Sequence, residues 1–286
     1  MRKRGFHATQ TGSWEKKSSQ QPRTQPPDLQ RLVLMTMSTA NTPQIHPVVL
    51  VGGGPGAWDL ITVRGMYALQ NADVILADHL GPTQDLHKLC DVDAKEVIDV
   101  SKLPYQRQTS QEKINELLIE HARAGRKVAR LKGGDPYVFG RGFEEVQALA
   151  AASLPVEVIP GVTSAVSVPA LAGVPVTHRG VVHAFTVVSG HLPPGHPKSL
   201  LDWGALAQSG ATLSIIMGVK NARAIAQAVQ DGGRSPQTPV AIIQEGTMEG
   251  ERTFRCTLGS LGETVESATI APPAVFVIGD VAGLTT

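Results

Sequence analysis

The residues most suited to chemistry gather in one short stretch, from Arg130 to Gly142, which combines glycine pairs with a carboxylate and three cations. Gly133 and Gly134 follow a strand-like run, and their lack of side chains lets a ligand approach the backbone closely. Asp135 then stands at the carboxyl end of that strand, the edge of an open α/β sheet where ligands bind. A carboxylate there could hold a ribose hydroxyl or face a cationic ligand. Gly-Gly-Asp-Pro alone is more typical of an ordinary strand-to-helix turn.

Other candidate residues end strand-like runs or begin helices elsewhere in the chain. Asp78 ends the second such run, where capping of the next turn is the commoner role. Lys102 follows the third run. Thr163 and Ser164 begin a helix of small residues, and N-capping is the ordinary role there too. Met217 ends a further apolar run, where core packing is commoner than ligand contact, although its polarisable sulfur suits an adenine ring or a sulfonium group.

A second glycine-rich loop, Gly52 to Ala57, follows an apolar run and matches the dinucleotide fingerprint Gly-x-Gly-x-x-Ala. Taken alone, this match indicates a nicotinamide-dependent oxidoreductase. Pro55, however, removes one backbone N–H from a loop that donates to pyrophosphate in dinucleotide enzymes. A nucleoside-triphosphate P-loop is excluded, because the sequence has no Gly-Lys-Ser or Gly-Lys-Thr.

The composition excludes several classes of function. The 286-residue chain has 42% hydrophobic residues, which is normal for a globular protein, and a net charge of only +1. This charge gives no overall field for nucleic acid or a membrane surface, and no run approaches the ~18 apolar residues of a transmembrane helix. Cys90 and Cys256 form no CxxC pair, and the histidines lack a metal-binding spacing. We therefore expect no metal, no nucleic-acid or membrane partner, and a reducing cytoplasm as the location.

Strand-like and helical segments alternate along most of the chain, which indicates an α/β fold. The expected strands are 48–51, 72–78, 96–100, 127–131, 156–159, 185–191, 211–217, 239–243 and 274–279. The expected helices are 59–72, with Asp59 as its N-cap, 109–124, 142–152, 165–172 and 222–230. Because the alternation restarts after Pro160, we expect an N-terminal α/β domain at 47–160 and a C-terminal α/β domain at 161–284. The polar residues 1–46 are expected to be a disordered extension that holds no further catalytic module.

Several motifs stand in the order typical of one family. The segment 133–142 resembles the Gly-Gly-Asp-Pro-Phe-Val-Phe-Gly-Arg-Gly signature of the tetrapyrrole methyltransferases, and the resemblance runs from about Val48 to Gly283. The other matching motifs are Val51-Gly-Gly-Gly-Pro-Gly56, Ala77-Asp78, Lys102, Pro160-Gly-Val-Thr-Ser-Ala165, Thr177-His-Arg179 and Ile216-Met-Gly218. Several ordered motifs are far more specific than one.

The resemblance implies two α/β domains in tandem, with the active site in the cleft between them. It implies a homodimer that uses S-adenosylmethionine to methylate uroporphyrinogen III at C2 and C7, giving precorrin-2 via precorrin-1 for sirohaem or cobalamin biosynthesis. Asp78 would be the base and Lys102 the acid. The positions implied to surround S-adenosylmethionine are Pro55, Gly133, Gly134, Asp135, Val138, Thr163, Ser164, Met217 and Gly246.

Three alternatives stay open beside this interpretation. The chain could be a later precorrin C-methyltransferase of the same family, a nicotinamide-dependent oxidoreductase, or a tetrapyrrole carrier without catalytic activity. Because uroporphyrinogen III carries several carboxylates, its site should be locally basic. The candidate cations are Lys102, Arg107, Lys132, Arg141, Arg179 and Lys220.

Overall fold

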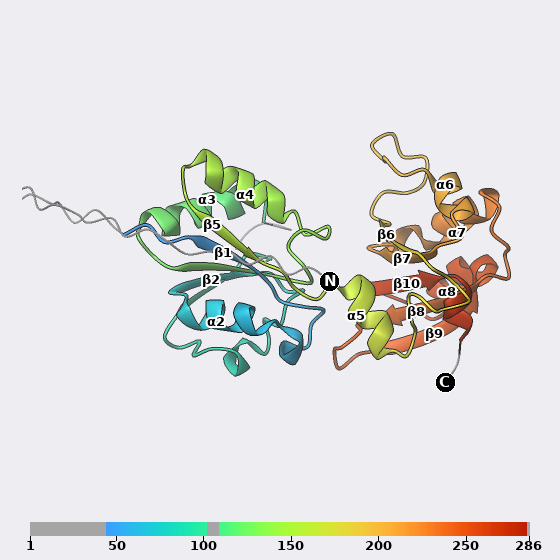
Figure 1. The fold of residues 1–286 in the computed structure, drawn as a ribbon, viewed down its shortest axis with the longest axis horizontal. Helices are drawn as coiled ribbons and strands as arrows, with labels where there is room; N and C mark the ends of the chain where they lie inside the picture. Colours follow the sequence, from blue (N-terminus) through green and yellow to red (C-terminus); the bar gives the residue numbers. More distant parts are fainter. Residues whose placement is uncertain (1–43, 102–108, 285–286) are drawn as a thin grey trace, which may run out of the picture. The chain divides into compact units, whose positions relative to one another are not determined.

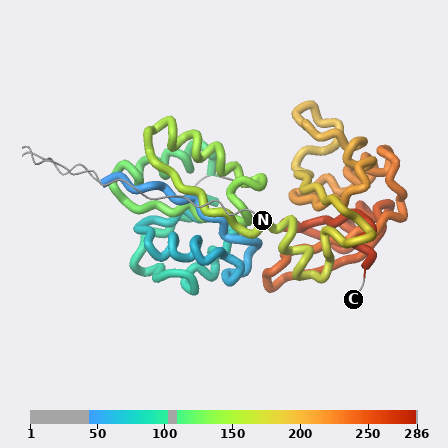
Figure 2. Tube along the Cα trace, viewed as in Figure 1, coloured from blue at the N-terminus to red at the C-terminus, as the bar shows by residue number. Residues whose placement is uncertain are grey.

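The computed structural model describes residues 44–101 and 109–284 (Figure 1). Two five-stranded sheets form its framework. Figure 2 shows that the chain completes the first sheet before it enters the second. Lys102 and Arg107, which the sequence singled out, lie outside the described residues.

All five strands of the first sheet are parallel, in the order β3-β2-β4-β1-β5. They are β1 (Val48–Gly52), β2 (Val74–Ala77), β3 (Glu96–Asp99), β4 (Val128–Lys132) and β5 (Val156–Ile159). The central strand β4 pairs with β1 and β2, so that Leu131 lies beside both Val51 and Ala77. Because the strands are parallel, their carboxyl ends meet at one edge, which brings the loops after β1, β2 and β4 together.

Helices cover both faces of the first sheet (Figure 1). They are α2 (Val63–Asn71), α3 (Gln111–Arg123) and α4 (Gly142–Ala151), with 3₁₀ turns η1 (Trp58–Leu60) and η2 (Leu86–Lys88) between strands. Leu69 of α2 shares an apolar cluster with Val51, whereas Leu118 of α3 and Leu149 of α4 share another with Leu50. Successive strand residues point to opposite faces, which explains why β1 and β2 carry no polar side chain.

The first helix begins later than the sequence indicated. Residues 58–60 form the 3₁₀ turn η1, and α2 starts only at Val63. The hydroxyl of Thr62 is the N-cap, since it accepts a hydrogen bond from the Gly65 N–H at 3.1 Å. The expectation that Asp59 caps this helix was therefore wrong, because Ile61 has an extended backbone and a good capping residue follows it.

The second sheet has the order β6-β7-β10-β8-β9, in which β6 and β7 are parallel and the other pairs antiparallel. Its strands are β6 (Phe185–Ser189), β7 (Thr212–Ile216), β8 (Pro239–Gln244), β9 (Arg252–Thr257) and β10 (Ala274–Ile278). The edge strand β9 was not expected, because its residues are largely polar and none of them is buried. An edge strand of this kind lacks the apolar pattern that marks a buried one.

Helices also cover both faces of the second sheet. They are α5 (Ser164–Leu171), α6 (Trp203–Gln208), α7 (Ala222–Asp231) and α8 (Leu261–Ser267), with 3₁₀ turns η3 (Val219–Asn221), η4 (Leu258–Ser260) and η5 (Asp280–Gly283). Ile225 of α7 packs in a cluster with Phe276, and Val168 of α5 packs in another with Val277. Within residues 44–101 and 109–284, no helix is both long and apolar enough to cross a membrane.

Candidate active site

The backbones of three glycines cross at the carboxyl edge of the first sheet. Gly54 after β1 and Gly134 after β4 exchange hydrogen bonds: the Gly54 N–H donates to the Gly134 carbonyl at 3.2 Å, and the Gly134 N–H donates back at 2.6 Å. A Cβ on Gly161, after β5, would overlap the Gly134 carbonyl oxygen. Glycine is therefore required at Gly161 for close approach of the loops, a role that the sequence analysis did not consider.

The loop from Gly52 to Ala57 does not offer its N–H groups to a pyrophosphate. The Gly53 N–H donates to the Lys132 carbonyl at 2.7 Å, and the Gly54 N–H is already paired. The Ala57 N–H donates to Thr247 Oγ1 at 3.1 Å. The chain then enters a 3₁₀ turn instead of a helix that begins at the loop. The nicotinamide interpretation thus lacks the phosphate cradle that it requires.

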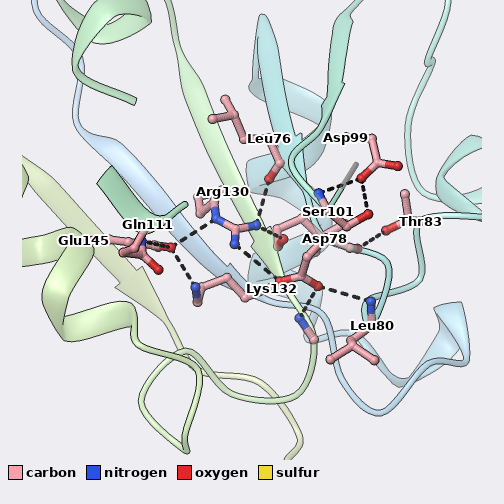
Figure 3. Close-up of polar contacts among 12 residues, drawn as sticks. Leu76, Asp78, Leu80, Thr83, Asp99, Ser101, Gln111, Arg130, Lys132 and Glu145 are labelled. Carbon is pink, nitrogen blue, oxygen red and sulfur yellow. Dashed lines mark hydrogen bonds and ion pairs between the residues drawn. The ribbon is translucent and has the colours of Figure 1, made fainter. Parts of the chain in front are cut away.

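Asp78 follows β2, and its carboxylate is anchored from two strands (Figure 3). Asp78 Oδ1 accepts hydrogen bonds from the N–H groups of Leu80 at 3.3 Å and Gly133 at 3.2 Å. Asp78 Oδ2 accepts from Arg130 Nη2 at 3.4 Å. The Leu80 bond is the local turn cap that the sequence allowed for, but a cap does not need the two bonds from β4. The side chain is still 24% exposed, so it can reach a ligand at this edge.

Behind Asp78 lies a buried ionic cluster that joins β4 to α4. The carboxylate of Glu145 has no exposed surface, and its Oε1 accepts from Lys132 Nζ at 2.8 Å, Gln111 Nε2 at 3.2 Å and Arg130 Nε at 3.3 Å (Figure 3). Burial lowers the pKa of Lys132, the Arg130 charge lowers it further, and Glu145 opposes both. The prediction that Lys132 could bind substrate carboxylates was wrong, because its ammonium is buried against Glu145.

Asp135 connects the loop after β4 to the end of β5. Its Oδ1 accepts from the Tyr137 N–H at 2.8 Å, and its Oδ2 accepts from the Gly161 N–H at 3.0 Å. The Val138 N–H donates to the Asp135 carbonyl at 3.2 Å, which closes the turn. Each carboxylate oxygen keeps a further lone pair, so that these bonds leave capacity for a ligand hydroxyl.

The space beside Gly134 fits the approach of a ligand. A Cβ at this position would meet nothing nearer than Thr163 Cα at 3.9 Å and the Ser164 nitrogen at 4.0 Å. Gly134 also has a left-handed φ of +66°, a conformation that favours glycine. Thr163 is the N-cap of α5, and its Oγ1 accepts from the Ala165 N–H at 3.4 Å. The backbone of Gly134 thus borders open space that a side chain would fill.

Three residues at strand ends of the second sheet have strained backbones. Met217 after β7 has φ +56°, and Glu245 and Thr247 after β8 have φ +50° and +72°. Such non-glycine conformations cost on the order of 1–3 kcal/mol and cluster at functional sites. Met217 is 47% exposed, so it is not the core residue that a methionine usually is. Gly246 stands between two of the strained residues and packs closely on α5, where a Cβ would overlap Val168.

The structure brings Asp78 and the loop 133–135 together at one edge, as the sequence indicated. The roles of Arg130 and Glu145 were missed. A signal for them was present, because Arg130 and Lys132 are alternate residues of a buried strand and therefore point to the same face. Two buried cations on one face require a carboxylate opposite them. Within residues 44–101 and 109–284, His, Cys, Asp and Glu side chains form no group of three or more that could hold a metal ion.

The chain belongs to the tetrapyrrole (corrin/porphyrin) methylases, whose family model matches residues 47–262. Among its relatives is the uroporphyrinogen-III C-methyltransferase of Methanocaldococcus jannaschii, 44% identical over 82% of this chain and 96% of that protein. Siroheme synthase 1 of Klebsiella pneumoniae is also 44% identical, over 83% of this chain and 49% of that protein. The fold matches the uroporphyrin-III C-methyltransferase of Thermus thermophilus complexed with S-adenyl homocysteine, with a TM-score of 0.70 and 36% identity over 84% of this chain and all of that one. The chain thus has the two α/β domains of this family.

Proposed function

We propose that this chain uses S-adenosylmethionine to methylate uroporphyrinogen III at C2 and C7, giving precorrin-2 via precorrin-1. The observation that carries the proposal is the anchored carboxylate of Asp78 beside the loop 133–135, in a chain that aligns with 96% of a uroporphyrinogen-III C-methyltransferase. The match to a siroheme synthase supports a place in sirohaem biosynthesis. The relatives favour this reaction over methylation of a later precorrin.

S-adenosylmethionine would supply a methyl group on a sulfonium centre. The open space beside Gly134 supports this cosubstrate, since a ligand can lie against the backbone there. The strained backbone of Met217 and its half-exposed side chain support a contact from the second sheet. The residues proposed to surround the cosubstrate are Pro55, Gly133, Gly134, Asp135, Val138, Thr163, Ser164, Met217 and Gly246.

Asp78 is proposed as the base. In each transfer a carbon–carbon bond forms to the methyl group while its carbon–sulfur bond breaks, and the substrate must lose a proton. Asp78 is exposed enough to receive that proton, while the Gly133 N–H and Arg130 keep its carboxylate in place. Lys102, proposed as the acid, follows β3, the neighbour of β2 in the sheet. Holding the two reactants in line supplies most of the remaining catalysis.

The substrate's carboxylates need cations outside the buried cluster. Arg179 and Lys220 are exposed and are proposed for this role, together with Lys102 and Arg107. Arg141 is exposed too, and its guanidinium donates to Glu144 from Nε at 2.9 Å and Nη2 at 2.7 Å. Solvent screens such an exposed pair, so that a substrate carboxylate could compete for Arg141 at low cost.

The test is to incubate the purified chain with uroporphyrinogen III and methyl-labelled S-adenosylmethionine. Mass spectrometry of the product should show two methyl groups per tetrapyrrole. A single methyl group would mean that the chain stops at precorrin-1. No transfer to uroporphyrinogen III, with transfer to a later precorrin, would replace the proposal by the alternative within the family.

The proposal also covers the domain boundaries, the oligomeric state and the cellular location of the chain. The first sheet ends with β5 and the second begins with β6, which supports domains at 47–160 and 161–284. The extension at 1–46 is proposed from the sequence, and a site in the cleft between the two domains is proposed from the family resemblance. The homodimer is proposed from the family resemblance. Cys90 and Cys256 are both free thiols, which supports a reducing, cytoplasmic location. Light scattering of the purified chain would test the dimer.

A further inference from the structure

The guanidinium of Arg130 lies between two carboxylates, one buried and one at the candidate site. Its Nε donates to Glu145 at 3.3 Å and its Nη2 to Asp78 at 3.4 Å (Figure 3). Its Nη1 donates to the carbonyls of Leu131 at 2.8 Å and Leu76 at 3.4 Å. Every nitrogen of the guanidinium is therefore fixed by a named partner, and the rigid fork allows little rotation.

We propose that Arg130, with Glu145 as its counter-charge, is a positioning residue that aims the Asp78 carboxylate and supplies the positive charge beside it. The inference rests on the proposed function, in which Asp78 is the base. Arg130 would not touch the substrate, since its side chain is only 4% exposed. It would act through Asp78, which it contacts across the boundary between the buried cluster and the candidate site.

The charges of the cluster indicate that Arg130 does more than pair with Glu145. Lys132 alone, at 2.8 Å from Glu145 Oε1, is enough to neutralise Glu145. Burying a second cation is costly unless another anion pairs with it, and Asp78 is that anion. Glu145 Oε2 is buried and finds no hydrogen-bond partner among the described residues, so all contacts of this carboxylate are made by Oε1. The two cations, Arg130 and Lys132, are thus matched by two carboxylates, Glu145 and Asp78.

The other groups near Asp78 come from four parts of the first sheet. His79 is its chain neighbour, and Asp99 ends β3 in register with Ala77 of β2. Arg130 and Lys132 come from β4, and Glu145 from α4. The Thr83 hydroxyl and the Gly133 N–H bond to Asp78 but carry no charge. Among the charged groups of the described residues, Arg130 donates directly to the Asp78 carboxylate, so its removal takes away the positive charge in contact with that carboxylate.

The test compares Arg130→Met and Glu145→Gln in the full chain. Single-turnover methyl transfer is measured as a function of pH, with cosubstrate affinity from equilibrium dialysis. Arg130→Met should lower the rate by up to about 100-fold, the cost of a misplaced reacting group, and should move the acidic limb of the pH profile to higher pH. Glu145→Gln keeps the shape of the side chain but leaves an excess positive charge, so that its acidic limb should move to lower pH. Affinity for the cosubstrate should stay unchanged in both.

Lys132→Met is the matched control, because Lys132 lies on the same face of β4 and contacts Glu145, but it donates no hydrogen bond to Asp78. Its acidic limb should move less than that of Arg130→Met. If Arg130→Met does not fold, two other variants still test the positioning role. One is Glu145→Gln, and the other is Arg130→Lys, which keeps the positive charge but loses the planar guanidinium. If the cluster had only a structural role, Arg130→Met and Glu145→Gln would lower the thermal midpoint but would leave the acidic limb of the pH profile in place. That result would overturn the inference.

The outcome for Asp78→Asn separates this inference from the proposed function. If the wild-type chain transfers no methyl group, or if Asp78→Asn transfers it at the wild-type rate, the proposed function fails. If Asp78→Asn loses activity while the limbs of Arg130→Met and Glu145→Gln stay in place, only the positioning role fails.

Discussion

The carboxylate of Asp78 has both a local and a long-range set of contacts. Its bond to the Leu80 N–H is that of a turn cap, whereas its other two bonds come from Arg130 of β4 and from Gly133 in the loop after β4. A cap contributes to stability and a base contributes to rate. The two roles therefore predict different consequences for the same substitution.

Asp78→Ala should lower the rate of methyl transfer by roughly 10²–10⁴-fold, the usual contribution of general base catalysis. Affinity for S-adenosylmethionine should change little, because the base acts when the substrate carbon loses its proton. A cap alone would instead cost roughly 0.5–2 kcal/mol of stability and leave the rate per folded molecule nearly intact. Single-turnover rate, cosubstrate affinity and thermal midpoint from one preparation separate these roles. A normal rate with a lowered midpoint would rule out the catalytic role.

Lys132→Met should change how stability depends on pH. Burial lowers the pKa of Lys132 in the folded chain, so the unfolded chain binds more protons between that pKa and the ordinary value of about 10.4. The contribution of Lys132 to stability is thus complete above the ordinary pKa and is lost as the pH falls through the folded pKa. Wild type should gain stability relative to Lys132→Met as the pH rises toward about 10. Denaturant unfolding over this range tests the slope, and parallel curves would contradict it.

The loop after β4 is the element on which the candidate site depends most. It bonds to Gly54 after β1, to Asp78 after β2 and to Gly161 after β5, so that it joins three other strand ends. A parallel sheet makes this possible, since it places all these ends at one edge. A change in this loop should therefore affect the ligand before it affects the core.

Gly134→Val should abolish binding of S-adenosylmethionine while the chain stays folded, because the new side chain would fill the open space beside Thr163. Part of the effect on stability will come from the left-handed φ of +66°, which a β-branched residue tolerates poorly. Gly173→Val is a matched control, since Gly173 has φ +68° and nothing within 4 Å of its would-be Cβ. Equilibrium dialysis should show lost affinity in Gly134→Val only. Retained affinity would argue against close backbone approach.

The sequence predicted those features that follow from the residue pattern of the strands themselves. The buried strands β1, β2 and β8 were predictable from their apolar runs, and the meeting of Asp78 with the loop 133–135 followed from parallel strand order. The short helices α6 and α8 and the polar edge strand β9 gave no comparable pattern. The pairing of Arg130 with Glu145 was not predictable either, since it depends on how α4 packs on the sheet. The role of Lys102 stays a prediction.

Binding of one ligand should stabilise the chain as a whole by mass action. A ligand at 100 times its dissociation constant adds about 2.7 kcal/mol to the free energy of unfolding, provided that it binds only the folded state. For a chain of this size, that corresponds to a rise of roughly 5–10 °C in the thermal midpoint. The ligand that produces this rise identifies the class of site.

S-adenosylhomocysteine should raise the thermal midpoint of the wild-type chain, and NAD at the same concentration should not. The reason is structural: the loop 52–57 uses its N–H groups at Gly53, Gly54 and Ala57 within the protein, which leaves no cradle for a pyrophosphate. Gly134→Val should remove the rise, whereas Asp78→Asn should keep it, because Asp78 is proposed to act on the substrate and not on the cosubstrate. Differential scanning calorimetry measures the midpoint of the wild-type chain with each ligand, and of Gly134→Val and Asp78→Asn with S-adenosylhomocysteine. A rise with NAD, and none with S-adenosylhomocysteine, would return the chain to the oxidoreductase interpretation.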